Sequence, residues 1–337
     1  MVDAARPVAV LPASLSFEAM FAEAARRHPS QAVTDFSPQM LVEGFVTVRL
    51  DFGSEEALKQ ARQFKPGLIV AEEADFLGLL AAAELSVPWV SHKLGIELPL
   101  PVIGALNGAF AARMTAHGLK AIPRSGVINI WPDALQPDDW QPSEDQVMLR
   151  PQPFEREGVE WSRPTFVGRE DRPLVLVTLG TVVNVLSLLS DVIGAVTASA
   201  DVNVIVTFNT QENADAAQVD RGRVQPVGFV PLSQLLKGVS MVVSDGGAGT
   251  VLSAMSQGLP MVILPLIADQ PLNAERVAHT GTGVSVKGAP EIGTATQRVL
   301  GEPSYHNAAQ RVAEQIAAMN LPEDVLTLLL QRAGLSA

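Results

Sequence analysis

The second half of the chain alternates short apolar runs with segments whose apolar residues recur at helical spacing. The apolar runs fall at 175–177, 202–207, 224–227, 241–243, 261–264 and 283–286. Strands that read as nearly continuous apolar runs, with helices between them, are typical of a parallel sheet covered by helices on both faces. The pattern therefore predicts a doubly wound α/β domain in this half.

The first half shows the same alternation less clearly. The predicted strands are 8–11, 32–34, 46–50, 68–71, 87–92 and 127–130, and the predicted helices are 17–27, 76–84 and 106–117. From 131 to 172 the periodicity stops and prolines recur, which favours an extended connector between two domains. Three tryptophans of this connector either line a ligand cleft or pin the connector to the core: Trp131, Trp140 and Trp161.

A glycine-rich turn follows the apolar run at 241–243. It reads Ser244-Asp245-Gly246-Gly247-Ala248-Gly249-Thr250 and leads into a helical segment. Glycines let the backbone turn sharply and approach a ligand, and the free N–H groups at a helix start attract phosphate oxygens. The spacing fits neither of the two common nucleotide loops, because it lacks a Lys-Ser/Thr pair and a G-x-G-x-x-G at the start of the chain. We interpret the turn as a site for a diphosphate.

The residues after this turn make the signal specific. A second apolar run, 261–264, is followed by Pro265, Asp269, Gln270 and Asn273. The whole segment, SDGGAGTVLSAMSQGLPMVILPLIADQPLNAERV, resembles the donor-binding signature of GT-B glycosyltransferases. The resemblance is to the bacterial enzymes that use nucleotide sugars to glycosylate antibiotics of the macrolide, enediyne and aromatic polyketide types.

The resemblance implies an α/β fold of the GT-B type, in which two Rossmann-like doubly wound domains face each other across a cleft. The implied boundaries are an acceptor-side domain over 1–155, a linker over 156–172 and a donor-binding domain over 173–320. A C-terminal helix over 321–337 is then expected to pack back on the N-terminal domain.

In that family a His-Gly-Gly-x-Gly-Thr turn binds the nucleotide diphosphate, and an Asp-Gln pair hydrogen-bonds the sugar. In this chain Asp245 replaces the histidine, and Leu232 replaces a glutamine that contacts the nucleobase. The resemblance implies a set of donor-binding residues in and around these motifs. They are Thr178, Gly180, Thr181, Val230, Asp245, Gly246, Gly247, Ala248, Gly249, Thr250, Asp269 and Gln270.

The carboxylate of Asp245 changes the electrostatics of the expected phosphate site. An Asp at this position repels a diphosphate, which predicts weak binding of ordinary nucleotide sugars. The alternative is that Asp245 only caps the following helix, since Asp is among the preferred N-cap residues.

The general base that deprotonates the acceptor is also altered. The family uses a histidine in the first strand-to-helix loop, and Ser14 falls near that position. A serine hydroxyl does not accept a proton unaided at neutral pH. The replacements closest in position lie at the carboxyl ends of two predicted strands and are Glu72, Glu73 and His92. The two glutamates could also be ordinary solvated residues, and an acidic acceptor such as a phenol would need little help.

Composition limits the alternatives. A chain of 337 residues with 47% hydrophobic content has room for two cores. Its formal net charge of -12 argues against binding to nucleic acid or to an anionic membrane surface. The chain has no cysteine and no apolar run long enough to cross a bilayer, so we expect a cytoplasmic protein that is not inserted in a membrane.

The leading hypothesis is an inverting glycosyltransferase of secondary metabolism. It would transfer a sugar or deoxysugar from a dTDP- or UDP-sugar donor to a small natural-product acceptor, with no metal and no other cofactor. The alternative is a GT-B homologue that has lost sugar transfer and acts as an accessory or partner protein, or that uses a different donor or chemistry. A homodimer or an activator protein would be compatible with either hypothesis.

Overall fold

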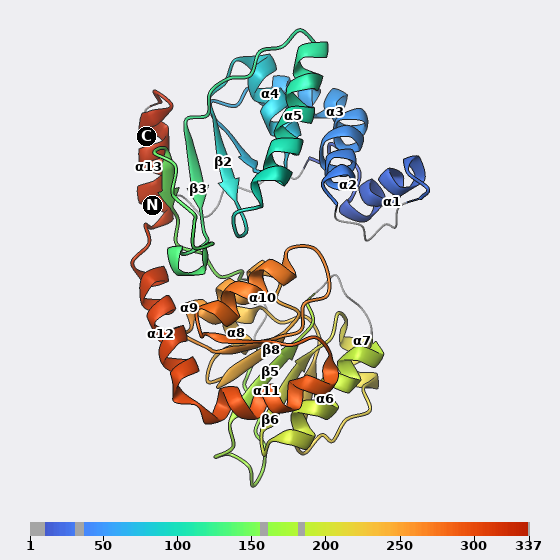
Figure 1. Cartoon of the computed structure of the whole chain (residues 1–337), viewed down its shortest axis with the longest axis vertical. Helices are drawn as coiled ribbons and strands as arrows, with labels where there is room; N and C mark the ends of the chain where they lie inside the picture. The colour runs from blue at the N-terminus through green and yellow to red at the C-terminus, as the bar shows by residue number, and fades with distance from the viewer. Residues whose placement is uncertain (1–10, 31–36, 156–160, 181–185, 336–337) are drawn as a thin grey trace.

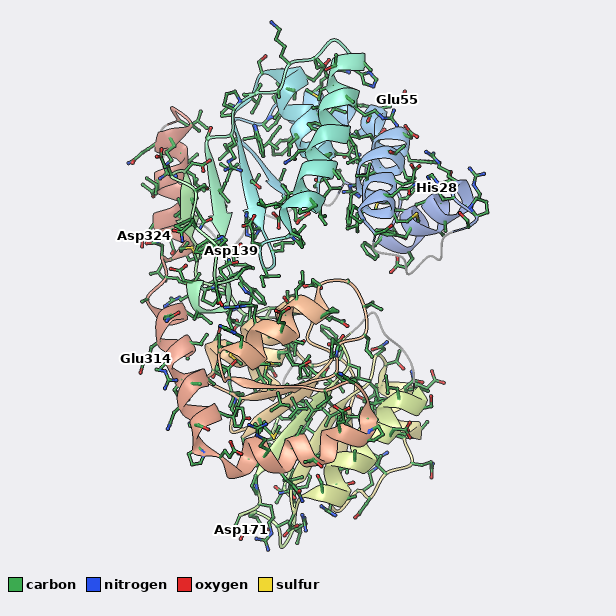
Figure 2. The ribbon with its side chains drawn as sticks, viewed as in Figure 1. His28, Glu55, Asp139, Asp171, Glu314 and Asp324 are labelled. Carbon is green, nitrogen blue, oxygen red and sulfur yellow. The ribbon has the colours of Figure 1, made fainter. Side chains whose placement is uncertain are left out.

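The structure, a computed structural model, describes residues 11–30, 37–155, 161–180 and 186–335. It contains two separate parallel sheets, each accompanied by helices, with one half of the molecule stacked on the other (Figure 1). Acidic side chains such as Glu55, Asp171 and Glu314 lie on the outside (Figure 2). No helix among the described residues is long and apolar enough to cross a membrane.

The first half begins with a helical layer. It consists of α1 (Phe17–Arg27), α2 (Pro38–Val42), a π-helical turn (Glu43–Val48) and α3 (Arg49–Phe64). The strand predicted at 46–50 was therefore wrong. Val46 and Leu50 pack against α4 and α5, whereas Val48 faces α1, so a helix buried on two sides produced a strand-like alternation. The strand predicted at 32–34, and most of the one at 8–11, fall outside the described residues.

The first sheet has its strands in chain order, β1-β2-β3-β4. They are β1 (Ile69–Glu72), β2 (Trp89–Lys93), β3 (Gly126–Asn129) and β4 (Gln146–Met148), with α4 (Phe76–Leu85) and α5 (Leu100–Ala116) between them. The strand β4 and a 3-10 turn, Asp133–Leu135, lie within the stretch expected to be an extended connector. On the other face, α13 (Pro322–Arg332) packs Val325 and Leu329 against Val90, Ile128 and Val147.

The second sheet follows the predicted runs closely. Its strands are β5 (Leu174–Thr178), β6 (Asn203–Thr207), β7 (Val224–Val227), β8 (Met241–Ser244), β9 (Met261–Ile263) and β10 (Gly283–Ser285). Their order is β10-β9-β8-β5-β6-β7, with every pair parallel, so the strand order reverses between β5 and β8. Ligands of doubly wound sheets bind at the carboxyl ends of the strands beside such a reversal.

Helices cover both faces of the second sheet. They are α6 (Leu186–Ser199), α7 (Gln211–Ala216), α8 (Leu232–Leu235), α9 (Ala248–Ser256), α10 (Gln270–His279), α11 (Ala289–Gly301) and α12 (Pro303–Ala317). Apolar residues of α6 and α11 fill the core on one face, and those of α9, α10 and α12 fill it on the other. The helices α9 and α10 lie on the side toward the first half, while α12 and α13 run along the edge of both halves (Figure 1).

A large cavity of about 2080 Å³ opens between the two halves. Its walls include His92 from the end of β2, the connector residues from Leu149 to Glu155, and the loops that follow β5 and β8. The fold therefore brings the carboxyl ends of strands from both sheets to a common space.

Candidate functional site

The glycine turn after β8 depends on glycine at one position in particular. Gly246 has a φ of +85°, and a Cβ atom there would lie 2.6 Å from Cγ2 of Ile263. Its N–H donates to Oγ of Ser244 at 3.1 Å. The backbone then enters α9 with Gly247 as the N-cap. The first residues of the helix line the cavity: Gly247, Ala248, Gly249 and Thr250.

Asp245 is buried inside this turn, with only 3% of its surface exposed. It is not the N-cap of α9. Its Oδ1 accepts from N–H of Gly247 at 3.3 Å, and its Oδ2 accepts from Nε2 of Gln270 at 2.8 Å. Burial raises the pKa of Asp245, and the neighbouring charge of Asp269 adds to the rise while backbone hydrogen bonds oppose it. The carboxyl group therefore lies at the position expected for the phosphate-binding histidine side chain, and it is desolvated there.

Gln270 has most of its hydrogen-bonding capacity used within the protein. Its Oε1 accepts from the N–H groups of Leu266 and Ile267, each at 2.8 Å, while its Nε2 donates to Asp245. The amide therefore ties the start of α10 to the glycine turn. This contact is at odds with a role in which Gln270 mainly binds sugar hydroxyls.

Asn273, one turn further along α10, completes the network. Its Nδ2 donates to the carbonyl of Gly246 at 2.9 Å and to Oδ2 of Asp269 at 2.8 Å. Of the Asp-Gln pair, Asp269 thus keeps its second carboxylate oxygen, and it lines the cavity. We infer that Asp269 is the better placed of the two to contact a ligand.

The loop after β5 approaches the turn from the other side. Gly180 has a φ of +68°, and a Cβ atom there would lie 2.9 Å from Oδ2 of Asp245, so the two loops meet at glycine. Oγ1 of Thr178 accepts from Oγ1 of Thr207 at 2.7 Å, and both threonines line the cavity. Thr181 lies outside the described residues.

The loop after β7 forms a further part of the wall, with Val230 and Leu232 among its lining residues. Phe229, in this loop, stacks edge to face on Phe154 of the connector, with ring centroids 6.1 Å apart. The sequence did not single out Phe154 or the connector arginines Arg150 and Arg163, which also line the cavity. An aromatic or basic residue in a connector carries no periodic signal, so its place follows only from the fold.

The three tryptophans of the connector differ in their surroundings. Trp131 is completely buried and donates from Nε1 to the carbonyl of Leu135 at 2.9 Å, so it pins the connector to the core. Trp161 lines the large cavity. Trp140 lines a separate crevice next to α10 and α12.

The four candidate bases divide into two groups. Among the described residues, the cavity wall includes His92 but not Ser14, Glu72 or Glu73. Oγ of Ser14 donates to the carbonyl of Arg49 at 3.3 Å, and Oε2 of Glu72 accepts from N–H of Ala74 at 2.9 Å. The fold therefore brings His92, and none of the other three, to the cavity that the glycine turn also lines.

Burial shifts the proton affinities of these groups in ways that matter for chemistry. It lowers the pKa of His92, so the imidazole is neutral at physiological pH and free to accept a proton. It raises the pKa of Glu72, and it raises the pKa of Glu73 to about 7, a rise that nearby Lys93 opposes. Among the residues that the structure describes, no three His, Cys, Asp or Glu side chains gather as a metal site.

The amino-acid sequence is similar to those of known proteins of antibiotic biosynthesis. Residues 190–331 match the family described as erythromycin biosynthesis protein CIII-like, C-terminal domain. The elloramycin glycosyltransferase ElmGT of Streptomyces olivaceus is 29% identical over 321 residues, which cover 94% of this chain and 80% of that protein. An L-demethylnoviosyl transferase of Streptomyces niveus is 28% identical over 272 residues, covering 76% of this chain and 69% of that protein.

Solved structures agree as well. The glycosyltransferase SsfS6 of Streptomyces sp. SF2575, in complex with thymidine diphosphate, superposes with a TM-score of 0.72 at 26% identity. The alignment covers 87% of this chain and 78% of SsfS6. The chain is a homologue of the GT-B antibiotic glycosyltransferases. The α/β fold of the GT-B type that the sequence predicted is thereby confirmed. Asp245 and Leu232 thus differ from the residues expected at these positions, in a chain that has the glycosyltransferase fold.

Proposed function

We propose that this GT-B homologue transfers a sugar or deoxysugar from a dTDP- or UDP-sugar to a small natural-product acceptor, with inversion at the anomeric carbon. The observation that carries the proposal is the shared cavity, which has His92 on one wall and the glycine loops after β5 and β8 on the other. The relatives named for sugar transfer, and the SsfS6 complex with thymidine diphosphate, support the same reading.

The donor diphosphate would lie against the start of α9 and the loop at Gly180. Unpaired N–H groups at a helix start provide partial positive charge, and they stabilise the negative charge that develops on the departing diphosphate. Thr250 lines the same wall. We propose that these groups suffice without a metal ion.

His92 is the proposed general base. A neutral imidazole accepts the proton of the acceptor hydroxyl as the oxygen attacks the anomeric carbon from the face opposite the diphosphate. One displacement of this kind inverts the anomeric configuration. Glu72 and Glu73 lie beside the end of β2, since Glu72 is in register with His92, but they are not in the cavity wall.

A product assay tests the proposal. The protein would be incubated with dTDP-glucose or UDP-glucose and a panel of phenolic and alcoholic aglycones, followed by mass spectrometry and NMR of the products. We expect one hexosyl unit on the acceptor, inverted anomeric configuration and stoichiometric release of nucleoside diphosphate. Donor binding without any acceptor glycosylation across the panel would count against transfer.

The second candidate is a homologue that no longer transfers sugar and acts as an accessory protein or with a different donor. The observation that favours it is the bond between Asp245 and Gln270, because it fills the expected anion site with a carboxylate of the protein itself. Failure of every nucleotide sugar to bind, in the native protein and in an Asp245→Asn variant alike, would favour this candidate. A cytoplasmic location and a homodimer or activator protein stay predictions.

A further inference from the structure

Asp245 is a carboxyl group without a cationic partner. No ion pair links it to an Arg, Lys or His anywhere in the described part of the chain. The start of α10 lies next to Asp245 and contributes a second acid, Asp269, and the neutral Gln270. The loop after β5 contributes Gly180. The titratable His92 and the charged groups Arg150, Arg163 and Lys237 belong to the same cavity wall, and none of them forms an ion pair with Asp245 in the described part of the chain.

A buried carboxyl group in such surroundings favours its neutral form, because burial removes water and the second acid repels the charge. The pKa of Asp245 is raised for these reasons. A bound diphosphate would bring further negative charge to the same place and shift the balance further toward the neutral acid. In that form the group also gains a donor, since a carboxylic acid donates one hydrogen bond whereas a carboxylate only accepts.

The hydrogen bonds that Asp245 accepts lower its pKa and so oppose the effect of burial, but the neutral form can keep the contact with Gln270. Gln270 donates to Oδ2, as it would to the carbonyl oxygen of a carboxylic acid. The proton then resides on Oδ1, the oxygen near Gly247 and the start of α9, where the contact with the backbone N–H is long at 3.3 Å. An acid at that position would donate toward a phosphate oxygen held at the helix start.

We propose that the donor site binds a nucleotide diphosphosugar together with one proton, which Asp245 takes up and donates as a hydrogen bond to the diphosphate. The proposal rests on the proposed function, because it assumes that the glycine turn holds the donor. It assigns Asp245 the role of a proton-dependent donor-binding residue, so donor affinity depends on pH although the donor itself does not titrate.

Isothermal titration calorimetry measures this proton directly. The probe is UDP-glucose or dTDP-glucose, because both phosphates are esterified and do not titrate near neutral pH. Titrations of the native protein in buffers of different ionisation enthalpy give the number of protons taken up. At pH values above the pKa of Asp245 in the free protein, we expect proton uptake that approaches one per donor, and about a tenfold loss of affinity for each pH unit in that range.

Two variants complete the experiment. Asp245→Asn keeps an acceptor for Gln270 and removes the charge, so it is expected to take up no proton and to bind with an affinity that changes little with pH. Glu155→Gln, which changes another acid of the cavity wall, is the matched control and is expected to take up the same proton as the native protein.

The outcomes separate the two claims. Tight binding by the native protein without proton uptake, at an affinity as independent of pH as that of Asp245→Asn, would overturn the proton coupling and leave the proposed function standing. Binding that requires added Mg²⁺ and takes up no proton would overturn it in favour of a bridging cation. No binding by either protein from about pH 5 to 8 would remove both claims together.

Discussion

Nε2 of Gln270 donates a hydrogen bond to Oδ2 of Asp245 at 2.8 Å, across 25 positions of the chain. The contact joins the two motifs from which the donor site was expected, and it gives the unusual carboxylate a partner. The side chain of Gln270 also accepts from two N–H groups of the loop before α10, so it connects that loop to the glycine turn. Asp245 and Gln270 therefore have to be treated as one unit.

Removal of the Gln270 side chain is expected to destabilise this unit. Gln270→Ala leaves the N–H groups of Leu266 and Ile267 without their acceptor and Asp245 without its donor. An unsatisfied group of this kind costs about 1–3 kcal/mol when it is fully buried. The N–H groups of Leu266 and Ile267 are only half-buried and can bond to water, so we expect a total loss of roughly 2–3 kcal/mol in the free energy of unfolding. Urea denaturation measures it. Gln218→Ala, at an exposed position, is the control and should change stability by less than about 0.5 kcal/mol.

The glycine turn offers a matched pair of substitutions. Gly246→Ala places a methyl group 2.6 Å from Ile263 at a φ of +85°, whereas Gly249→Ala meets nothing within 4 Å and lies in α9. We expect the first to cost about 1–3 kcal/mol and to abolish donor binding, because the turn must move. The second should be neutral or stabilising by up to about 1 kcal/mol. Equal unfolding midpoints for the two variants would show that the turn does not need glycine.

Replacement of Asp245 by histidine should strengthen the donor site. Asp245→His exchanges a buried carboxyl group for a side chain that donates to phosphate at any pH near neutrality. We expect donor affinity at about pH 8 to rise about tenfold or more, since a change of ~1.4 kcal/mol gives a factor of ten. Calorimetric titration with UDP-glucose measures the gain. A variant that binds no better would mean that the side chain at this position does not face the phosphates.

Glu73 predicts a pH dependence of stability. Burial raises its pKa from 4.5 to about 7, so the folded protein holds this proton more tightly than the unfolded chain does. The free energy of unfolding contributed by Glu73 is then greatest below pH 4.5 and falls as the pH rises from 4.5 to about 7. Glu73→Gln should therefore stabilise the protein by about 1–3 kcal/mol at a pH above 7, and by much less at acid pH.

Thermal or urea unfolding of native protein and Glu73→Gln, at acid and at alkaline pH, measures this difference. The exposed Glu155→Gln is again the control and should show no such dependence. A Glu73→Gln variant that is equally stabilised at both pH values would indicate better packing rather than the loss of a buried charge.

The sequence predicted the second sheet well and the first less well, for physical reasons. The buried strands β5, β6, β8 and β9 are nearly continuous apolar runs, a pattern typical of a parallel sheet covered on both faces. The segment around Val46 and Val48 is a helix packed on two sides, so its burial pattern imitates a strand. Local periodicity contains no information on how many neighbours a helix will have.

The candidate site was predicted in its motifs but not in its contacts. The glycine turn and His92 were found from local patterns and Gly180 from the resemblance to GT-B glycosyltransferases, and all of them line one cavity. The bond between Asp245 and Gln270 could not be predicted, because it depends on how two loops meet in space. For the same reason the sequence could not separate His92 from Glu72 and Glu73, since all three lie at the carboxyl ends of strands and only the fold decides which one faces the cavity.

The central claim is that sugar transfer takes place between His92 and the glycine loops, and the turnover of His92→Ala tests it most directly. Positioned proton transfer is worth about 100- to 10,000-fold in rate, so the turnover number should fall by that factor. Donor affinity measured by calorimetry should stay the same, because His92 belongs to the first half of the molecule and the proposed donor site to the second. His279→Ala, in the separate crevice, should behave as the native protein does. Unchanged turnover in His92→Ala, or an equal loss of donor affinity, would contradict the account.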